Sequence, residues 1–355
     1  MISYFFGFSL WKQKNIESFF SKLIDGNIIF VKDLNDALQK GLMRGDQIYI
    51  WGKKVFDGLD VWAKENSVQV YRVEDGFIRS VSLGSDLTKA YSLVVDSRGI
   101  YFDPTTQSDL EYIFQNYNFD EEILQRAKSL QQYLIDKKIS KYNIHQDKEV
   151  TFDTDKKIVL VIGQVEDDAS IIYGGDGMNN LKLLQKVYEK RKDEYIIYKP
   201  HPDVLVRNRK GNIQKDIVLE YANEQIDNIS LPSLLDVCDE VHTITSLSGF
   251  EGLIRGKKVY TYGMPFYAGW GLSIDNKACE RRERLLSIEE LIAGTYILYP
   301  RYMSPKNGNL CEIEDLINSL ELMKKRYNSK LYKYIINIRN IISRLGLLIV
   351  RILKD

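Results

Sequence analysis

Short apolar runs alternate with amphipathic stretches along most of the chain. In its first part, residues 27–32, 47–51 and 68–73 are rich in β-branched and aromatic residues. Helical spacing alternates with these runs, around residues 16–23 before the first and around 55–65 before the third. Strands that alternate with helices are typical of a parallel sheet with helical crossovers. The pattern therefore predicts an α/β unit at the start of the chain.

The alternation begins again after a polar, charged stretch at residues 137–157. Residues 157–162 form a continuous apolar run, as expected for a central parallel strand that is buried on both faces. Residues 194–198, 240–244 and 258–262 predict three further strands. We therefore predict two doubly wound, Rossmann-like sheets in one chain.

Two more predictions concern the end of the first unit. Residues 93–96 and 100–102 flank Ser97-Arg98-Gly99, which predicts a hairpin, and residues 108–134 predict one or two helices. A helix at about residues 311–323 is expected to return and brace the first unit.

The last stretch of the chain has a different pattern. Apolar residues recur at steps of three and four from Leu331 to Ile352, and lysines and arginines fall largely on the other side. Such a basic amphipathic helix suits an anionic membrane surface, and packing on the body or on a partner is the alternative. We thus expect a first unit at 1–150, a second at 151–310, a returning helix at 311–328 and a membrane-associating tail at 329–355.

Composition narrows the class of protein. The 355 residues are enough for two α/β domains, and a formal net charge of zero gives no general attraction to nucleic acid. Cys238, Cys279 and Cys311 lack CxxC spacing, so neither a disulfide framework nor a zinc site is predicted. No apolar run reaches the roughly 18 residues of a membrane span, and the start lacks the pattern of a signal peptide. A cytoplasmic protein that associates peripherally with a membrane surface is expected.

Polar motifs follow four of the predicted strands. Parallel α/β sheets place ligand contacts at the carboxyl ends of strands, so these motifs are the candidate functional residues. They are Glu74-Asp75-Gly76, Gln164-Val165-Glu166-Asp167-Asp168, Lys199-Pro200-His201-Pro202 and Thr245-Ser246-Leu247-Ser248-Gly249.

The serine-rich motif precedes an apolar-periodic helix. Backbone N–H groups and hydroxyls at a helix N-terminus suit a phosphate, and plain N-capping by Ser246 or Ser248 is the alternative. His201 stands between two prolines that fix the backbone, so its imidazole is aimed and can donate to a phosphate or protonate a leaving group.

The acidic motifs allow several interpretations. Glu74 and Asp75 sit where a sheet presents ligand contacts, or they form an exposed acidic turn. Asp167 and Asp168 suit a metal ligand, a general base or a nucleophile, and a solvated surface turn is the alternative.

The order of these motifs is similar to that in two-domain GT-B glycosyltransferases that use CMP-activated acidic sugars. Longer stretches resemble the capsule polysaccharide biosynthesis family, whose KpsC-like members are retaining β-Kdo transferases, and in particular the second of their two transferase modules. The matching stretches are RVEDGFIRSVSLGSDL (72–87), SLVVDSRGIYFDPTTQSDLE (92–111), SKYN (140–143), GQVEDDASI (163–171), YKPHPDVLVRNRKG (198–211), DEVHTITSLSGFEGLIRGKKV (239–259) and YGMPFYAGWGLS (262–273).

The resemblance implies a GT-B-like α/β fold and a CMP-β-Kdo-dependent transferase that works by double displacement. It implies Asp168 as nucleophile, with Asp167 as the alternative, and Glu74 as acid/base, with Asp75 as the alternative. His201 would assist departure of CMP. The implied donor contacts are Ser246, Ser248, Thr245 and Gly249 at the phosphate, Glu251 at the ribose, Arg79 at the Kdo carboxylate, and Lys199, Gln164, Tyr267 and Trp270 elsewhere in the donor pocket.

The resemblance also implies the partners. They are CMP-Kdo, a lipid-linked Kdo oligosaccharide acceptor, the inner-membrane surface and other capsule biosynthesis enzymes, with no metal and no other cofactor. The likeness to the second module favours a β-2,7 over a β-2,4 linkage. Two alternatives stand beside it: a GT-B transferase for another CMP-activated acidic sugar, and a non-catalytic module that docks on the membrane through its tail.

Overall fold

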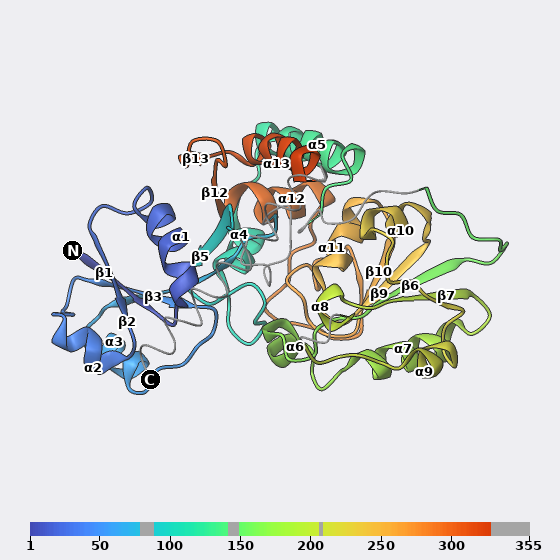
Figure 1. The fold of residues 1–355 in the computed structure, drawn as a ribbon, viewed down its shortest axis with the longest axis horizontal. Coiled ribbons are helices and arrows are strands. Elements are labelled where there is room, and N and C mark those ends of the chain that lie inside the picture. Colours follow the sequence, from blue (N-terminus) through green and yellow to red (C-terminus); the bar gives the residue numbers. More distant parts are fainter. Residues whose placement is uncertain (79–88, 141–148, 206–208, 328–355) are drawn as a thin grey trace.

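The computed structural model describes residues 1–78, 89–140, 149–205 and 209–327. Two sheets lie side by side, each with helices on both faces (Figure 1). Both sheets are built from strand–helix alternation, so the α/β class and the GT-B-like arrangement of two Rossmann-like units are confirmed. Arg79 and the basic tail at 329–355 lie outside the described residues.

The first sheet has seven strands in the order β13-β12-β5-β4-β3-β1-β2. Its strands β1 to β4 pair in parallel, with β2 at the edge, and β5, β12 and β13 add antiparallel pairings at the other side. The strands are β1 Ile2–Phe6, β2 Asn27–Val31, β3 Gln47–Trp51, β4 Gln69–Asp75, β5 Ser92–Asp96, β12 Pro300–Met303 and β13 Leu310–Cys311. The helices between them are α1 Leu10–Phe20, α2 Leu34–Gln39, α3 Leu59–Glu65, α4 Asp109–Asn116 and α5 Glu121–Asp136.

Aromatic side chains fill both faces of this sheet. Tyr4 and Phe6 of β1 pack into one layer and Phe5 into the opposite layer, and all three are fully buried. Alternating side chains on a central strand reach opposite faces, which is why the apolar start of the chain forms an interior strand.

The predicted hairpin at residues 93–102 is wrong. Residues 92–96 form β5, which pairs antiparallel with β4 and β12, and residues 100–102 form no strand. The side chain of Asp96 redirects the chain, because its Oδ1 accepts from the N–H groups of Arg98 (3.0 Å) and Gly99 (2.7 Å). Its Oδ2 accepts from Asp109 N and from the Tyr299 hydroxyl. Burial raises the pKa of the Asp96 carboxyl.

The second sheet has six strands in the order β11-β10-β9-β6-β7-β8, and all its pairings are parallel. Its strands are β6 Ile158–Ile162, β7 Tyr195–Lys199, β8 Glu224–Gln225, β9 Glu240–Thr243, β10 Lys258–Thr261 and β11 Ile274–Asp275. Its helices are α6 Ala169–Gly174, α7 Asn180–Arg191, α8 Pro202–Leu205, α9 Lys215–Leu219, α10 Leu231–Val237 and α11 Leu247–Ile254.

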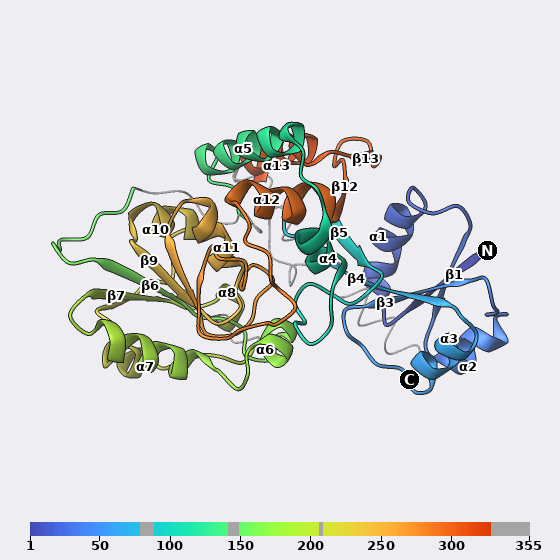
Figure 2. The same ribbon diagram turned by 180° about the vertical axis from the view of Figure 1, so that it is seen from behind.

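After the second sheet the chain returns to the first. It passes through α12 Ile288–Ile292 and the π-helical η2 Ala293–Leu298, enters β12 and β13, and continues in α13 Ile313–Tyr327. Seen from behind, α5, α12 and α13 lie together along one side of both units (Figure 2). Arg126 of α5 pairs with Glu312 and Glu314 at the start of α13.

This return bears on the predicted division of the chain. The strand β12 belongs to the first sheet, although the sequence analysis assigned residues up to 310 to the second unit. The boundaries at 150 and 310 stay a prediction. In the described part of the chain, no helix combines the length and the apolar character needed to cross a bilayer.

Candidate active site

Three of the four polar motifs meet at one edge of the second sheet. The strand β6 lies between β7 and β9, and all three run parallel. Their carboxyl ends therefore share an edge, where open α/β sheets bind ligands. The acid-rich motif, the histidine motif and the serine-rich motif follow these three strands in turn.

The serine-rich motif forms the N-terminus of α11. Ser246 is the N-cap, and its Oγ accepts from Ser248 N at 3.1 Å. The Thr243 hydroxyl accepts from Ser246 N, and the two serine hydroxyls lie 3.1 Å apart. Both serines are half-buried, so the motif caps the helix and still offers two hydroxyls and a helix N-terminus at the strand edge. Its contact with a phosphate stays a prediction.

Gln164 ties the acid-rich motif to the serine-rich motif. Its Oε1 accepts from Thr245 N at 2.8 Å and from the Thr243 hydroxyl, and its Nε2 donates to the Thr245 hydroxyl at 3.1 Å. Both Gln164 and Thr245 are buried. Gln164 therefore positions the serine-rich turn, whereas a contact with the sugar donor was predicted from the sequence.

Asn180, at the start of α7, supports the loop of the candidate site and was not predicted from the sequence. Its Oδ1 accepts from Gln164 N at 2.9 Å, and its Nδ2 donates to the carbonyls of Gln164 and Gly211. The side chain of Glu166 accepts from Asn180 N. Asn180 is 1% exposed, and it holds the loop that carries the two aspartates. A polar residue at a helix start was the available signal, but N-capping by its neighbour Asn179 explains that pattern equally well.

The two aspartates of this loop differ in their bonding. Asp168 is the N-cap of α6, and its Oδ1 accepts from Ser170 N at 3.0 Å and from the Ser170 hydroxyl at 2.8 Å. Asp167 pairs with Arg209, with 3.1 Å between Oδ1 and Nε. Both side chains are exposed. Asp168 is thus oriented by α6, while Asp167 points to a cation on a neighbouring loop.

The helix α6 brings this loop against the first unit and lies between the two sheets (Figures 1 and 2). The ammonium of Lys53 lies 4.6 Å from the Tyr173 ring centroid, and Tyr173 also packs on Phe102. On the other side, a Cβ at Gly174 would meet Thr245 of the serine-rich turn at 3.2 Å. Asp168 therefore belongs to a helix that contacts both units.

Glu74 and Asp75 end the strand β4 and point to opposite faces of it. A Cβ at Gly52 would lie 3.2 Å from Glu74 Oε2, and the next residue, Lys53, contacts Tyr173 of α6. Asp75 instead lines a pocket beside α1. Of the two acids, Glu74 is on the side of the sheet that faces the helix capped by Asp168.

His201 precedes α8, and its ring is fixed from one side. Its Nδ1 accepts from Asp203 N at 3.2 Å, and its carbonyl accepts from Val204 N. In the neutral ring the proton is then carried by Nε2. The local bonding confirms an aimed imidazole.

Lys199, the last residue of β7, is 7% exposed and donates from Nζ to the carbonyl of Ile229 at 2.7 Å. Burial lowers the pKa of its ammonium to about 8, and the charge of Asp227 opposes that shift. A lysine with such a pKa changes its charge within the range in which enzymes are commonly assayed.

Three predicted donor contacts lie in the interior. Tyr267 is fully buried and donates its hydroxyl to the carbonyl of Ser246 at 2.6 Å. Trp270 is fully buried, donates to the carbonyl of Phe266, and packs on Phe114. Glu251 is 4% exposed within α11. All three side chains are therefore buried, and Tyr267 holds the carbonyl of Ser246 from inside the protein.

Gly249 is required by this packing. A Cβ there would lie 2.2 Å from the Tyr267 hydroxyl and 3.0 Å from Thr243. Any side chain would displace the tyrosine that holds the Ser246 carbonyl. From the sequence, Gly249 was predicted to be part of a phosphate-binding turn. In the structure, its missing side chain also leaves room for Tyr267 beneath that turn.

Comparisons with known proteins agree with this geometry. Residues 46–302 match the family model described as capsule polysaccharide biosynthesis protein. The capsule polysaccharide modification protein LipA of Neisseria meningitidis is 45% identical over 85% of this chain and 43% of its own length. The lipopolysaccharide-processing protein LpsZ of Rhizobium meliloti is 39% identical over 86% of this chain and 71% of its own length.

Two solved structures of Thermosulfurimonas dismutans KpsC are also similar. The beta Kdo 2,7 transferase is 38% identical, with a TM-score of 0.73, over 91% of this chain and 100% of that one. The beta Kdo 2,4 transferase is 32% identical, with a TM-score of 0.76, over 89% of this chain and 97% of that one.

The chain spans less than half of the length of LipA, so it corresponds to one part of that longer protein. The family match covers most of the chain, and the strand-end motifs of the second sheet and the end of β4 fall within it. The chain belongs to the capsule polysaccharide biosynthesis protein family.

Proposed function

We propose that this chain transfers Kdo from CMP-β-Kdo to a Kdo-terminated, lipid-linked acceptor with retention of the β configuration. The observation that carries the proposal is the likeness to the KpsC beta Kdo 2,7 transferase, 38% identical over the whole of that chain. The arrangement of an exposed aspartate, a serine-rich helix N-terminus and an aimed histidine at one sheet edge supports it.

In the proposed first step, a carboxylate oxygen of Asp168 attacks the anomeric carbon of Kdo. The bond from that carbon to the phosphate oxygen breaks, and CMP leaves with the electron pair. The hydroxyls and N-terminal N–H groups around Ser246 and Ser248 neutralise the phosphate, and Nε2–H of His201 donates to it. A carboxylate suits an anomeric carbon that develops positive charge.

In the second step, Glu74 takes the proton of the acceptor hydroxyl. The acceptor oxygen then displaces Asp168 from the anomeric carbon, so two inversions restore the β configuration. Glu74 is preferred to Asp75 because it lies beside Gly52, whose neighbour Lys53 contacts Tyr173 of α6.

The proposed linkage is β-2,7. Sequence identity is higher to the 2,7 transferase (38%) than to the 2,4 transferase (32%) at similar coverage. The TM-scores rank the two the other way, but linkage is chosen by side chains around the acceptor, for which identity is the closer guide.

The experiment that tests the proposal is a product assay with purified protein. CMP-β-Kdo and a synthetic acceptor that ends in Kdo should give CMP and one added Kdo, and NMR should show a β anomer joined at O7. The donor preference is read by offering a CMP-activated nine-carbon acidic sugar in parallel. Transfer of that sugar in place of Kdo would favour the second candidate function, and an α product would contradict retention.

The charge of Lys199 gives a pH prediction. We expect inhibition by CMP to weaken several-fold between pH 7 and pH 9.5, because an ammonium with a pKa of about 8 loses its attraction for the phosphate over that range. The Lys199→Met variant should bind CMP more weakly at pH 7 and show no further loss. The measurement is the CMP inhibition constant as a function of pH.

A loss of stability at high pH would not explain weaker inhibition by CMP. The folded pKa of Lys199 lies below the ordinary value of 10.5, so the unfolded chain binds more protons between about pH 8 and pH 10.5. The contribution of Lys199 to stability therefore improves as pH rises through this window. A CMP affinity that stays constant to pH 9.5 in the native chain would remove Lys199 from the donor site.

The basic tail at 329–355 is proposed to hold the enzyme at the inner-membrane surface, near its lipid-linked acceptor and other capsule enzymes. Its amphipathic pattern and basic face support this. We expect the chain to cosediment with vesicles that contain anionic lipid, and the chain cut after residue 328 to stay in the supernatant. Equal binding by both chains would contradict the proposal.

A further inference from the structure

The two carboxylates of the proposed reaction come from different units. Asp168 caps α6 in the second unit, and Glu74 lies at the end of β4 in the first. Ser246 and His201, which act on the phosphate in the proposed first step, also belong to the second unit. The bond changes of the first step therefore use the second unit, whereas the second step needs a carboxylate from each. A change in how the units are spaced should act mainly on the second step.

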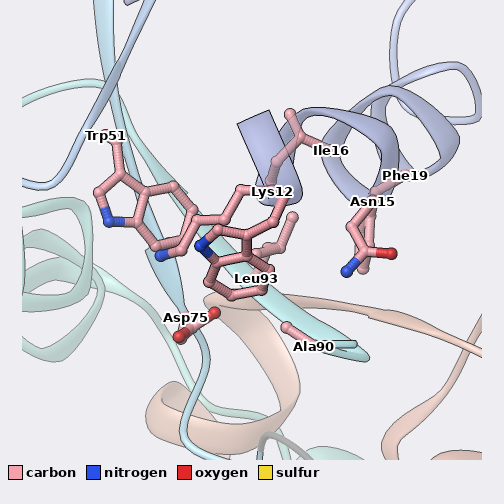
Figure 3. Close-up of a pocket in the computed structure, with 9 residues that line it drawn as sticks. Lys12, Asn15, Ile16, Phe19, Trp51, Asp75, Ala90 and Leu93 are labelled. Atoms are coloured by element: carbon pink, nitrogen blue, oxygen red, sulfur yellow. The ribbon is translucent and has the colours of Figure 1, made fainter. Parts of the chain in front are cut away.

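The end of β4 has a fixed position in the first unit. Glu74 pairs with Val94 of β5, and Gly76 donates its N–H to the carbonyl of Ser92 at 2.9 Å. A Cβ at Gly76 would overlap the Ser92 side chain, so strand and neighbour are in close contact. Figure 3 shows Asp75 among the residues beside α1, and alternation along the strand puts Glu74 on the opposite face.

Phe77, three residues after Glu74, contacts the second unit. It is 1% exposed, and its ring centroid lies 4.9 Å from that of Phe266 in the loop after β10. Phe266 is itself buried and packs on Phe250 of α11, with 5.4 Å between the ring centroids. The contact between Phe77 and Phe266 therefore joins the end of β4 to the interior of the second unit.

The loop that carries Phe266 is attached to the helix that Asp168 caps. Two residues before Phe266, Met264 donates its N–H to the carbonyl of Gly174 at 2.8 Å. Gly174 is the last residue of α6, and Asp168 is the N-cap of the same helix. A Cβ at Gly263 would overlap the Gly174 carbonyl, so loop and helix lie against each other. One aromatic contact thus links the backbone segments that carry the two carboxylates.

We propose that the buried contact between Phe77 and Phe266 sets the distance between Glu74 and Asp168. The inference rests on the proposed function, because it takes these carboxylates as acid/base and nucleophile. Phe77 and Phe266 are positioning residues, since each acts through the backbone that it shares with a carboxylate or with the helix that carries one. A smaller side chain at either position leaves a cavity between the units, which closes in part by a shift of one unit against the other.

The two steps of the reaction give the kinetic test. In Phe77→Leu at saturating CMP-β-Kdo, the Kdo adduct should form at close to its native rate. Release of the adduct to a Kdo-terminated acceptor should slow by roughly tenfold to a hundredfold, because a misplacement of about 1 Å can cost that much. The measurement is the rate of each step in a single turnover, followed by intact mass after rapid quenching. A variant in which both steps slow equally, or in which neither slows, would contradict the inference.

Phe20→Leu is the matched control. Phe20, at the end of α1, is also 1% exposed, but it packs on Phe5 and Tyr49 inside the first unit. The substitution removes the same atoms from a buried site and should lower stability by a comparable amount. We expect both steps to keep their native rates. Release that slows as much in Phe20→Leu as in Phe77→Leu would make lost stability the cause and overturn the inference.

Phe266→Leu tests the same contact from the second unit. It should slow release of the adduct as Phe77→Leu does. The double variant should be little slower than either single variant, because all three lose one shared contact. Effects that multiply in the double variant would mean that the two side chains act separately, which the inference does not allow.

Amide hydrogen exchange separates this inference from the proposed function. Peptides that contain Met264, whose N–H is bonded to Gly174, should exchange faster in Phe77→Leu and at the native rate in Phe20→Leu. Faster exchange across the units supports the contact even if the native chain transfers no Kdo. Transfer of Kdo by the native chain, together with exchange at Met264 that Phe77→Leu does not change, overturns the contact and leaves the function standing.

Discussion

Asp168→Asn is expected to lower the rate of Kdo transfer by about 10⁴-fold or more, because an amide cannot form the proposed covalent bond to the sugar. The substitution is suited to the local structure. Asp168 caps α6 by accepting from Ser170 N and the Ser170 hydroxyl, and asparagine is an equally good N-cap. The loss should therefore appear in kcat with little change in the denaturation midpoint.

Asp167→Asn is the matched control for this prediction. Asp167 stands next to Asp168 in the same loop, but it pairs with Arg209 in an exposed ion pair, and such pairs contribute little to stability. We expect this variant to retain activity within a few-fold of the native chain. A nearly inactive Asp167→Asn beside an active Asp168→Asn would exchange the roles of the two residues.

Glu111→Ala is expected to lower the free energy of unfolding by about 3–5 kcal/mol, because it leaves a buried guanidinium without its partner. Glu111, in α4, is 3% exposed and pairs with Arg281 at 2.8 Å and with Arg282 at 3.1 Å. Arg282 is also buried and donates to the carbonyls of Pro265 and Ala268. The network thus fastens the loop behind the serine-rich turn to the first unit. The measurement is urea denaturation followed by circular dichroism.

Two controls separate charge from shape at this position. Glu111→Gln keeps an acceptor for Arg282 Nε and should cost less than Glu111→Ala. Arg281→Ala removes the more exposed of the two arginines and should cost about 1 kcal/mol or less. If Glu111→Ala costs no more than Arg281→Ala, the buried pair does not fasten the loop.

The strands of both sheets could be predicted from the sequence because their apolar runs are local signals. Residues 47–51 and 158–162 form β3 and β6 within a residue of the expected bounds, and α13 falls where a returning helix was expected. The predicted hairpin at residues 93–102 does not form, because the carboxylate of Asp96 accepts hydrogen bonds from the N–H groups of Arg98 and Gly99. A turn that is stabilised by a single side chain produces no periodic pattern of apolar residues, so the sequence pattern does not predict it.

The polar residues at the strand ends of the candidate site could be predicted from the sequence, but the residues that support them could not. The motifs at the strand ends predicted that Ser246, His201 and Asp168 lie at the edge of the second sheet, where the structure places them, because residue type and position after a strand carry that information. The supporting layer was not predictable, because the bonds from Gln164 to Thr245 and from Asn180 to Gln164 join segments far apart in the sequence.

Trp270 shows the opposite error, a residue that was predicted to contact the donor but is buried. An aromatic residue in a glycine-rich loop after a strand predicted a donor contact, yet the ring is buried against Phe114 and its N–H bonds to Phe266. Composition alone does not distinguish an aromatic side chain that lines a site from one that packs behind it. Gly249 and Tyr267 belong to the same buried layer.

The central claim is that Kdo passes through a covalent bond to Asp168, and the intact mass of the protein tests it most directly. Native chain and Asp168→Asn are incubated with CMP-β-Kdo without acceptor and then analysed by mass spectrometry. The account predicts one Kdo-sized adduct on the native chain, none on Asp168→Asn, and loss of the adduct when a Kdo-terminated acceptor is added. An adduct of the same size on Asp168→Asn, or transfer by a native chain that never carries one, would contradict it.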